Sequence, residues 1–502
     1  MLDLVNTFIS WRMKKRFHQI ELFLRHPHEV QQELLLAQLH KARDTKWGRH
    51  YHFSEIKRYE EFARRVPLHT YEDLEKEIEE LRQGAENRMW PGKIKWFAKS
   101  SGTTNSRSKF IPVTQEAIEG NHFKAGKDLL SIYCHNFPET KIFSGTNLRL
   151  GGSTFGDAEH GSFYGDVSAI LIEHLPFWVE MRSTPNSRIS LMSEWEEKLE
   201  AMAHTSMKED VTSLAGVPSW MLVLINRVLE LSGKDNLHEV WPNLELYMHG
   251  GVNFTPYRPQ YEALMDKPLN YLDTYNASEG FFALQDQPGV NELLLMLDYG
   301  IFYEFIPMEH FNGTHSPTVP LWEVERGKNY ALVISSNAGL WRYLIGDTIR
   351  FTSLKPYRIQ ITGRTKHFIN TFGEELIVEN AETALSRTCQ AHQLRIKDYT
   401  VAPVYMEGRQ RGAHEWLIEF EEDPRDQSAF AQDLDRELQK VNSDYEAKRY
   451  KNMALSPLKL NLAQPGLFYQ WLKAKGKLGG QHKVPRLSND RRYMDEMLKM
   501  NL

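Results

Sequence analysis

Apolar residues recur at helical spacing in some stretches of the chain and form short uninterrupted runs in others. The helical pattern predicts helices over residues 1 to about 45, Tyr71–Arg82, Gln115–Cys134 and Trp220–Leu231. The last of these is the most apolar run in the chain, but Asn226 and Arg227 interrupt it and it is too short to span a bilayer. We therefore expect a core helix there.

Short apolar runs between glycine turns predict strands over Leu244–Met248, Leu293–Leu297, Tyr330–Ser335 and Thr348–Thr352. From residue 143 to residue 172 the composition changes to Gly, Ser, Thr and brief apolar runs, which indicates further strands and loops. Strands that alternate with helices in this way predict an α/β fold with mixed α+β layers.

The pattern changes near Arg358–Phe372. Beyond this segment it predicts, in order, a helix over Val378–Ala391, strands over Tyr399–Tyr405 and Glu415–Phe420, and a helix over Ser428–Asn442. This compact alternation is typical of a small separate domain. We expect a large N-terminal domain over residues 1–363, a hinge at 364–368 and a small C-terminal domain over 369–502.

Composition narrows the possible classes of protein. The 502 residues are 41% hydrophobic and 25% charged with a net charge of −5, which indicates no nucleic acid or anionic membrane partner. The two cysteines, Cys134 and Cys389, are far apart and predict no disulfide framework, which favours a reducing, cytoplasmic setting. The apolar Leu2–Trp11 precedes a basic cluster, the reverse of a secretion signal. An amphipathic helix on its own domain or on a membrane surface fits this segment.

A loop rich in small donors stands between two strand-like runs, Ile94–Ala98 and Phe110–Thr114. Backbone N–H groups and hydroxyls in such a loop can wrap a phosphate while a lysine supplies charge. A Ser/Thr-rich surface turn fits the same composition. The residues concerned are Ser100, Ser101, Gly102, Thr103, Thr104 and Lys109.

Two later segments place carboxylates at strand ends. In Tyr271–Gly280, a carboxylate beside a hydroxyl can hold Mg2+ against triphosphate oxygens, although a strand end with a capping serine has the same appearance. In Gly339–Asp347, an Asp that follows Gly can accept both hydroxyls of a ribose, although a Gly-Asp hairpin turn fits as well.

Two lysines lie in glycine-rich surroundings near the predicted domain junction and the chain end. Gly363–Lys366 is either a hinge or a plain linker between domains. Gln481–Arg486 follows a glycine-rich stretch, so its lysine can reach a distant site or can simply be solvated. The chain contains no Gly-Lys-Ser/Thr, Gly-x-Ser-x-Gly or His-Glu-x-x-His, so P-loop NTPase and common hydrolase interpretations lack support.

In their order, these segments resemble the adenylate-forming acyl ligases, and more closely the Gretchen-Hagen-three (auxin-responsive) family of acyl-acid amido synthetases. The family's Ser-Ser-Gly-Thr loop with a lysine matches Ser100–Lys109, and its Tyr-x-x-Ser-Glu matches Tyr275–Glu279. Its Arg-Tyr-x-x-Gly-Asp matches Arg342–Asp347, and its Gln-x-Lys-x-Pro-Arg matches Gln481–Arg486. The resemblance extends from about Thr45 to Arg486.

The resemblance implies an adenylate-forming fold, with ATP and Mg2+ as cofactors, and roles for individual residues. Glu279 would help to hold Mg2+, Lys366 would lie at the hinge and Lys483 would contact the reacting groups. The residues implied in ATP binding are Ser100, Ser101, Gly102, Thr103, Thr104, Lys109, Gly250, Gly251, Tyr275, Ser278 and Asp347.

The implied reaction has two steps: a carboxylate attacks the α-phosphorus of ATP, and an amino acid amine then takes the acyl group and releases AMP. The expected partners are therefore a small carboxylic acid and an amino acid, and the expected state is a monomer or weak dimer without a membrane span. Two alternatives remain open, an acyl- or aryl-CoA ligase with the same first step and a nucleotide-binding protein without activity. The sequence does not identify the acid.

Overall fold

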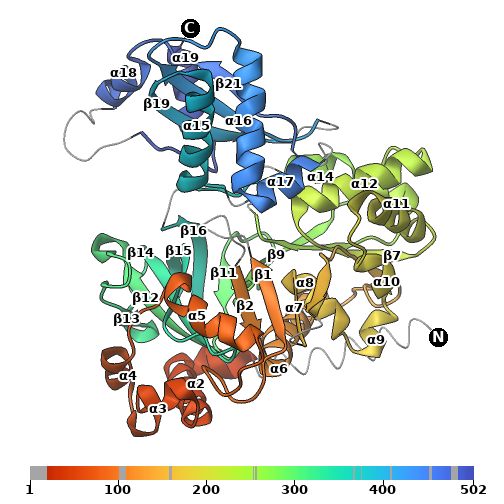
Figure 1. Ribbon diagram of the computed structural model, residues 1–502. Helices are drawn as coiled ribbons and strands as arrows, with labels where there is room; N and C mark the ends of the chain where they lie inside the picture. Colours follow the sequence, from red (N-terminus) through yellow and green to blue (C-terminus); the bar gives the residue numbers. More distant parts are fainter. Residues whose placement is uncertain are drawn as a thin grey trace.

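The computed structural model describes residues 20–100, 109–157, 161–252, 254, 257–365, 368–374, 376–406, 410–450, 455–475 and 484–501. Its largest element is a mixed sheet whose strands lie in the order β13 (Val319–Pro320), β12 (Ile301–Pro307), β14 (Asn329–Ser336), β15 (Tyr343–Leu354), β16 (Tyr357–Arg364), β11 (Leu293–Leu295), β10 (Gly280–Leu284), β9 (Asn270–Ala277), β8 (Leu246–Gly250), β7 (Val211–Ala215), β3 (Thr146–Arg149) and β6 (Ser183–Thr184) (Figure 1). Strands β9, β8, β7, β3 and β6 are parallel to one another, whereas the other neighbouring pairs, including β9 with β10, are antiparallel.

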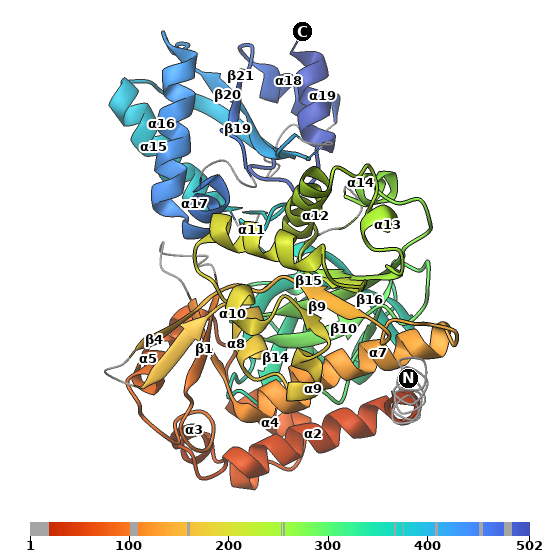
Figure 2. The same cartoon turned by 90° about the vertical axis from the view of Figure 1, so that its right-hand side faces the viewer.

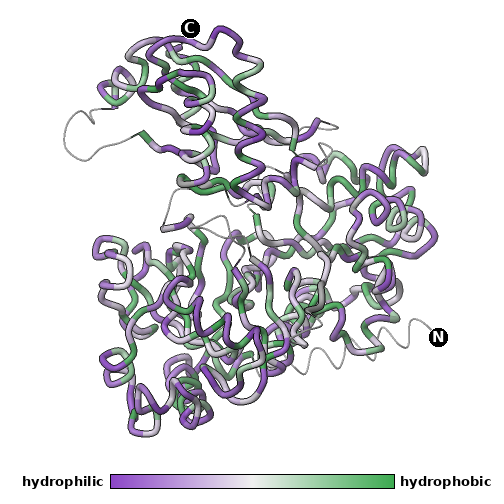
Figure 3. The backbone as a smooth tube through the Cα atoms, in the orientation of Figure 1, coloured by the Kyte–Doolittle hydropathy of each residue, from purple (hydrophilic) through white to green (hydrophobic). Residues whose placement is uncertain are grey.

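A second, four-stranded sheet carries the Ser/Thr-rich loop. Its order is β2 (Lys109–Val113), β1 (Trp96–Ser100), β5 (Ser162–Gly165) and β4 (Thr154–Asp157). The N-terminal helices α2 (Pro27–Ala42), α3 (Lys46–His50), α4 (Tyr59–Arg65) and α5 (Tyr71–Arg82) pack against the sheets and complete one large core. Strands β12 and β14 are buried along almost their whole length, and Figure 3 shows long hydrophobic stretches inside this part of the molecule.

Further helices pack against the two sheets and against one another. They are α6 (Gln115–Ala117), the π-helix η2 (Ile118–Phe123), α7 (Lys124–Asn136), α8 (Val167–Glu173), α9 (Phe177–Glu180), α10 (Ser187–Ser190), α11 (Trp195–Ser206), α12 (Pro218–Ser232), α13 (Leu237–Val240) and α14 (Arg258–Ala263). Three short 3-10 helices, η1 (Phe53–Glu55), η3 (Met308–His310) and η4 (Leu321–Glu323), occur in connections. Helix α12 is the core helix expected over Trp220–Leu231, and no helix in the described part of the chain is long and apolar enough to cross a membrane.

The elements after β16 form a smaller body at the top of Figure 1. A short pair, β17 (Phe368–Ile369) and β18 (Leu376–Ile377), precedes a three-stranded sheet of β19 (Ile396–Val404), β20 (Ala413–Phe420) and β21 (Lys459–Leu462). The helices of this body are α15 (Val378–His392), α16 (Gln427–Val441), α17 (Ser443–Arg449), α18 (Leu467–Ala474) and α19 (Arg492–Met500). Figure 2 shows it standing over α11 and α12.

Most predicted elements are present, and the mixed α/β fold is confirmed. Helix α5 has the predicted bounds, because Thr70 and Asp73 form a capping box at its start. The change of pattern near Arg358–Phe372 overlaps β16, which pairs with β15 and β11 within the large sheet, and the smaller body begins after this strand.

Candidate functional site

The Ser/Thr-rich loop closes a hairpin between β1 and β2. Ser100 and Lys109 are paired residues of this hairpin, so the ends of the loop are fixed. The Phe110 N–H donates to the Tyr71 hydroxyl at 2.9 Å, and the Lys109 ammonium lies 5.5 Å from the centre of the Tyr71 ring. The loop residues Ser101, Gly102, Thr103 and Thr104 lie outside the described residues, as does the side chain of Ser100.

Two glycines stand at the carboxyl end of β8, beside the carboxyl end of β9. A Cβ on Gly250 would lie 2.4 Å from the Thr274 hydroxyl oxygen and 2.6 Å from the Thr274 carbonyl oxygen, so a side chain does not fit. Gly251 has φ +82°, a conformation that favours glycine. Ligands of α/β sheets bind beyond the carboxyl ends of parallel strands, and both glycines lie there.

The turn from β9 to β10 carries Ser278 and Glu279, and a residue of a π-helix positions the strand that follows this turn. The π-helix η2 interrupts the helix predicted over Gln115–Cys134, and its buried Asn121 reaches β10. The Asn121 amide accepts a hydrogen bond from the Phe281 N–H at 2.7 Å and donates to the Phe281 carbonyl at 3.0 Å. Asn121 therefore holds the strand that follows Glu279.

Asp347 lies on β15 opposite this turn, within a strand and not in the alternative hairpin turn. The Tyr275 hydroxyl donates to Asp347 Oδ2 at 2.6 Å, and Arg364 Nε lies 2.7 Å from Asp347 Oδ1. Arg364 and Asp347 are paired residues of β16 and β15. Tyr275 and Arg364 thus contact different oxygens of the carboxylate, and because each such oxygen has two lone pairs, the oriented group can also accept hydroxyl groups.

Glu279 is a half-buried carboxylate near three other charges. Burial raises the pKa of Glu279 above its ordinary range, and the Lys109 ammonium opposes this rise. Arg364 lowers the same pKa and Asp347 raises it, so these four side chains from β2, β9–β10, β15 and β16 act on one another. The Tyr343 hydroxyl donates to Glu279 Oε1 at a long 3.3 Å.

The fit of this arrangement to Mg2+ can be judged from its donors. The described residues contain no group of three His, Cys, Asp or Glu side chains that could hold a metal by themselves. Mg2+ is commonly bound through one or two carboxylates together with substrate phosphates, and Glu279 is a carboxylate of the kind that such a site requires.

The structure brings together Lys109, Tyr275, Glu279 and Asp347, with Gly250 and Gly251 on the adjoining strand. Lys366 and Lys483 lie outside the described residues. The end of the Lys483 motif is anchored on the C-terminal sheet, where the Thr400 hydroxyl donates to the Pro485 carbonyl at 2.6 Å. Sequence reasoning did not assign Asn121, Tyr343 or Arg364 to the site, although Arg364 follows a glycine in the segment that drew attention as a hinge.

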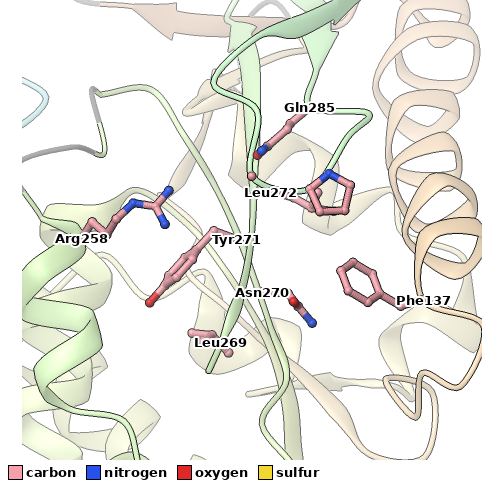
Figure 4. Close-up of a pocket in the computed structure, with 9 residues that line it drawn as sticks. Phe137, Arg258, Leu269, Asn270, Tyr271, Leu272 and Gln285 are labelled. Atoms are coloured by element: carbon pink, nitrogen blue, oxygen red, sulfur yellow. The ribbon is translucent and has the colours of Figure 1, made fainter. Parts of the chain in front are cut away.

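A separate pocket of about 150 Å3 lies near the opposite, amino-terminal end of β9 (Figure 4). Its lining residues are Phe137, Arg258, Leu269, Asn270, Tyr271, Leu272, Gln285, Pro288 and Gly289. The strand places this pocket several residues away from Tyr275 and Glu279, so it does not belong to the candidate site.

Comparison with known proteins gives matches along most of the chain. Residues 16–269 match the GH3 family N-terminal domain, 294–364 the central domain and 379–492 the C-terminal domain. An indole-3-acetic acid-amido synthetase, GH3.3 of Arabidopsis thaliana, is 22% identical over 94% of this chain and 91% of its own length.

Two solved structures are similar in fold. The GH3.15 acyl acid amido synthetase has a TM-score of 0.62 at 16% identity, covering 97% of this chain and 96% of that chain. A 2-hydroxyisobutyryl-CoA ligase, solved with 2-HIB-AMP and CoA in the thioesterification state, has a TM-score of 0.57 at 14% identity and covers 95% and 93%.

Proposed function

This chain belongs to the GH3 family, and from that premise we propose that it is an ATP-dependent, AMP-forming acyl-acid amido synthetase. It would activate a carboxylic acid as an acyl-adenylate and transfer the acyl group to an amino acid amine. The observation that carries the proposal is the cluster of Lys109, Tyr275, Glu279 and Asp347 beside the glycine end of β8. The described residues of three of the family's motifs support the proposal, because they lie together near the carboxyl ends of β8 and β9, where α/β proteins bind ligands.

We propose that ATP lies across this edge. The loop from Ser100 to Thr104, with Lys109, would receive the phosphates through N–H groups, hydroxyls and the ammonium. Gly250 and Gly251 would let the adenine approach the backbone of β8, with Tyr275 and Ser278 nearby. Asp347, held by Tyr275 and Arg364, would accept the ribose hydroxyls.

Glu279 would hold Mg2+ against the phosphate oxygens. When bound, the ion neutralises the charge that grows on the phosphates as the substrate carboxylate attacks the α-phosphorus. The half-buried position of Glu279 supports this role, because a carboxylate with little water around it binds a cation more strongly than a solvated one does.

Lys483 would contact the reacting groups during adenylation. Residues 364–368, which include Lys366, would act as a hinge. The C-terminal body, residues 369–502, would turn about this hinge relative to residues 1–363 before the second step. The present arrangement of the two bodies is proposed to be that of acyl transfer. The likeness that supports this spans both bodies and is to a ligase in its thioesterification state.

The acceptor is proposed to be an amine. A thiol acceptor is the second candidate, because the similar CoA ligase pairs the same kind of fold with CoA. The family match favours the amide, and the clustered charged side chains disfavour a protein that only binds nucleotide. We also propose a cytoplasmic location, since Cys134 and Cys389 are both buried and not joined in a disulfide.

The test is pyrophosphate release with Mg-ATP across a panel of aryl, indole and fatty acids, each with and without mixed amino acids. We expect release that depends on one class of acid, with AMP and an amide formed once an amino acid is present. Release without an amide, followed by a thioester on addition of CoA, would replace the amide by the thiol reaction. No pyrophosphate release with any acid, together with tight ATP binding, would favour a protein that binds nucleotide without catalysis.

A further inference from the structure

One contact between the two bodies is made by Tyr257, at the start of α14. Tyr257 is fully buried, and its hydroxyl donates to the carbonyl of Thr371 in the C-terminal body at 2.6 Å. One turn further along α14, the Gln260 amide donates to the carbonyl of Met406. A third contact places the Lys448 ammonium of α17 at 4.4 Å from the centre of the Trp220 ring on α12.

These contacts join two otherwise separate hydrophobic regions. Tyr257 and Tyr261 of the N-terminal part share one continuous core cluster with Phe372 and Tyr445 of the C-terminal body. Phe372 is fully buried there. Figures 1 and 2 both show the C-terminal body resting on this helical layer, above the large sheet. The two bodies are therefore docked through specific hydrogen bonds and a shared set of buried side chains.

The same segment leads back to the candidate nucleotide site. His249 precedes Gly250 on β8, is buried, and stacks on Phe254 with ring centres 4.0 Å apart. The Tyr257 N–H donates to the Phe254 carbonyl at 2.9 Å. A continuous series of contacts thus runs from the glycine end of β8 through Phe254 and Tyr257 to Thr371, and such a series can transmit a displacement.

We propose that Tyr257 is a positioning residue that holds the C-terminal body in the acyl-transfer arrangement and couples that arrangement to the adenine-side end of β8. This inference rests on the proposed function. The Tyr257 hydroxyl bonds to a carbonyl of the other body, so turning of that body breaks the bond. Because an unpaired buried carbonyl is unfavourable, the bond favours the docked state specifically.

A matched control lies four residues along the chain. The Tyr261 hydroxyl is also fully buried and also donates to a backbone carbonyl, that of Pro218 at 2.8 Å, but within the N-terminal part. Tyr257→Phe and Tyr261→Phe therefore remove the same chemical group from the same core, and each leaves a carbonyl without that donor. A general effect on packing should be shared by both variants, whereas an effect on docking should appear with Tyr257→Phe alone.

The experiment measures both half-reactions of the full chain in single turnover, with the acid that supports pyrophosphate release in the wild type. We expect Tyr257→Phe to slow amide formation from preformed acyl-adenylate about five- to tenfold while adenylation stays within about twofold. Tyr261→Phe should leave the ratio of the two rates unchanged. Gln260→Ala, which removes the neighbouring contact, should change the ratio in the same direction by a smaller factor.

A second readout follows the docking itself. Spin labels at exposed positions on α5 and α16 should show a broader distance distribution in Tyr257→Phe than in Tyr261→Phe. Equal ratios and equal distributions in the two variants would overturn the inference while leaving the synthetase assignment intact. A wild type without pyrophosphate release for any acid would instead remove the proposed function on which the inference rests.

Discussion

Two carboxylates of the large sheet, Glu304 and Glu279, differ in the hydrogen bonds that they accept from neighbouring side chains. Glu304 is fully buried on β12, where its Oε1 accepts hydrogen bonds from Arg342, Tyr59 and Thr318 at 2.8–3.1 Å. Glu279 is partly buried, and the hydrogen bond that its carboxylate receives from the Tyr343 hydroxyl is long at 3.3 Å. The Glu304 carboxylate therefore has no capacity left to bind a ligand, whereas the Glu279 carboxylate retains that capacity.

The same contrast separates two charged residues of one sequence motif. Arg342 and Asp347 belong to the same Arg-Tyr-x-x-Gly-Asp segment, yet Arg342 turns into the core with φ +45°, and its Nη1 donates to the carbonyls of Ala63 and Val66 at 2.7 Å. Asp347 turns to the candidate site. Charged residues in one motif can therefore have different roles, and the number of protein partners distinguishes them.

Glu279→Gln should have the largest effect. The amide keeps the size of the side chain but loses the charge that would hold Mg2+, so pyrophosphate release at saturating Mg-ATP should fall about a thousandfold. Because the amide keeps the size of the side chain and the Tyr343 hydrogen bond to Glu279 is long at 3.3 Å, the midpoint of thermal unfolding should change little. Retained turnover in this variant would remove the metal role of Glu279.

Arg342→Met should show the opposite pattern. It leaves Glu304 as a buried unpaired carboxylate, so the free energy of unfolding in urea should fall by about 3 kcal/mol. Activity per folded molecule should remain close to that of the wild type. The double variant Arg342→Met/Glu304→Leu removes both charges and should recover most of the stability; if it does not, the pair is not what makes Arg342 important.

Tyr275→Phe should give a smaller effect on binding. Asp347 keeps Arg364 but loses the hydroxyl donor at 2.6 Å, so the KM for ATP should rise about tenfold with kcat little changed. Tyr303→Phe is the control variant in the buried core. It also removes a tyrosine hydroxyl, one that donates to the Met296 carbonyl at 3.1 Å. That variant should lower stability and leave KM unchanged, and equal KM values in the two variants would contradict the assignment of Asp347.

The smallest effect concerns pH. Burial raises the pKa of Glu279, and a protonated carboxyl does not hold Mg2+, so activity should decline on acidification at a pH above the ordinary range of a glutamate. Lys109 opposes that rise, so Lys109→Met should move this acidic limb of the kcat/KM profile upward by less than about one pH unit. A limb that moves downward or stays in place would show that Lys109 does not act on Glu279.

Local patterns predicted much of this molecule. Tyr71–Arg82 was predicted as a helix, and the structure shows that its capping box and its buried face both lie within these residues and Thr70, so a local pattern was sufficient. The Gly-Asp segment could not be assigned locally, because the partners of Asp347 lie 72 residues before it at Tyr275 and on the next strand at Arg364. The same limit applies to Asn121, whose role depends on a π-helix and a strand 160 residues away.

Trapping the intermediate tests the central claim most directly. The protein would be incubated with Mg-ATP and the acid that supports pyrophosphate release, quenched before and after addition of an amino acid, and the products measured by mass spectrometry. We predict an acyl-AMP adduct before the addition, which disappears as AMP and the amide form. Amide formation that yields ADP and inorganic phosphate, without an acyl-AMP adduct, would contradict the assignment of an adenylate-forming site to Glu279 and Asp347.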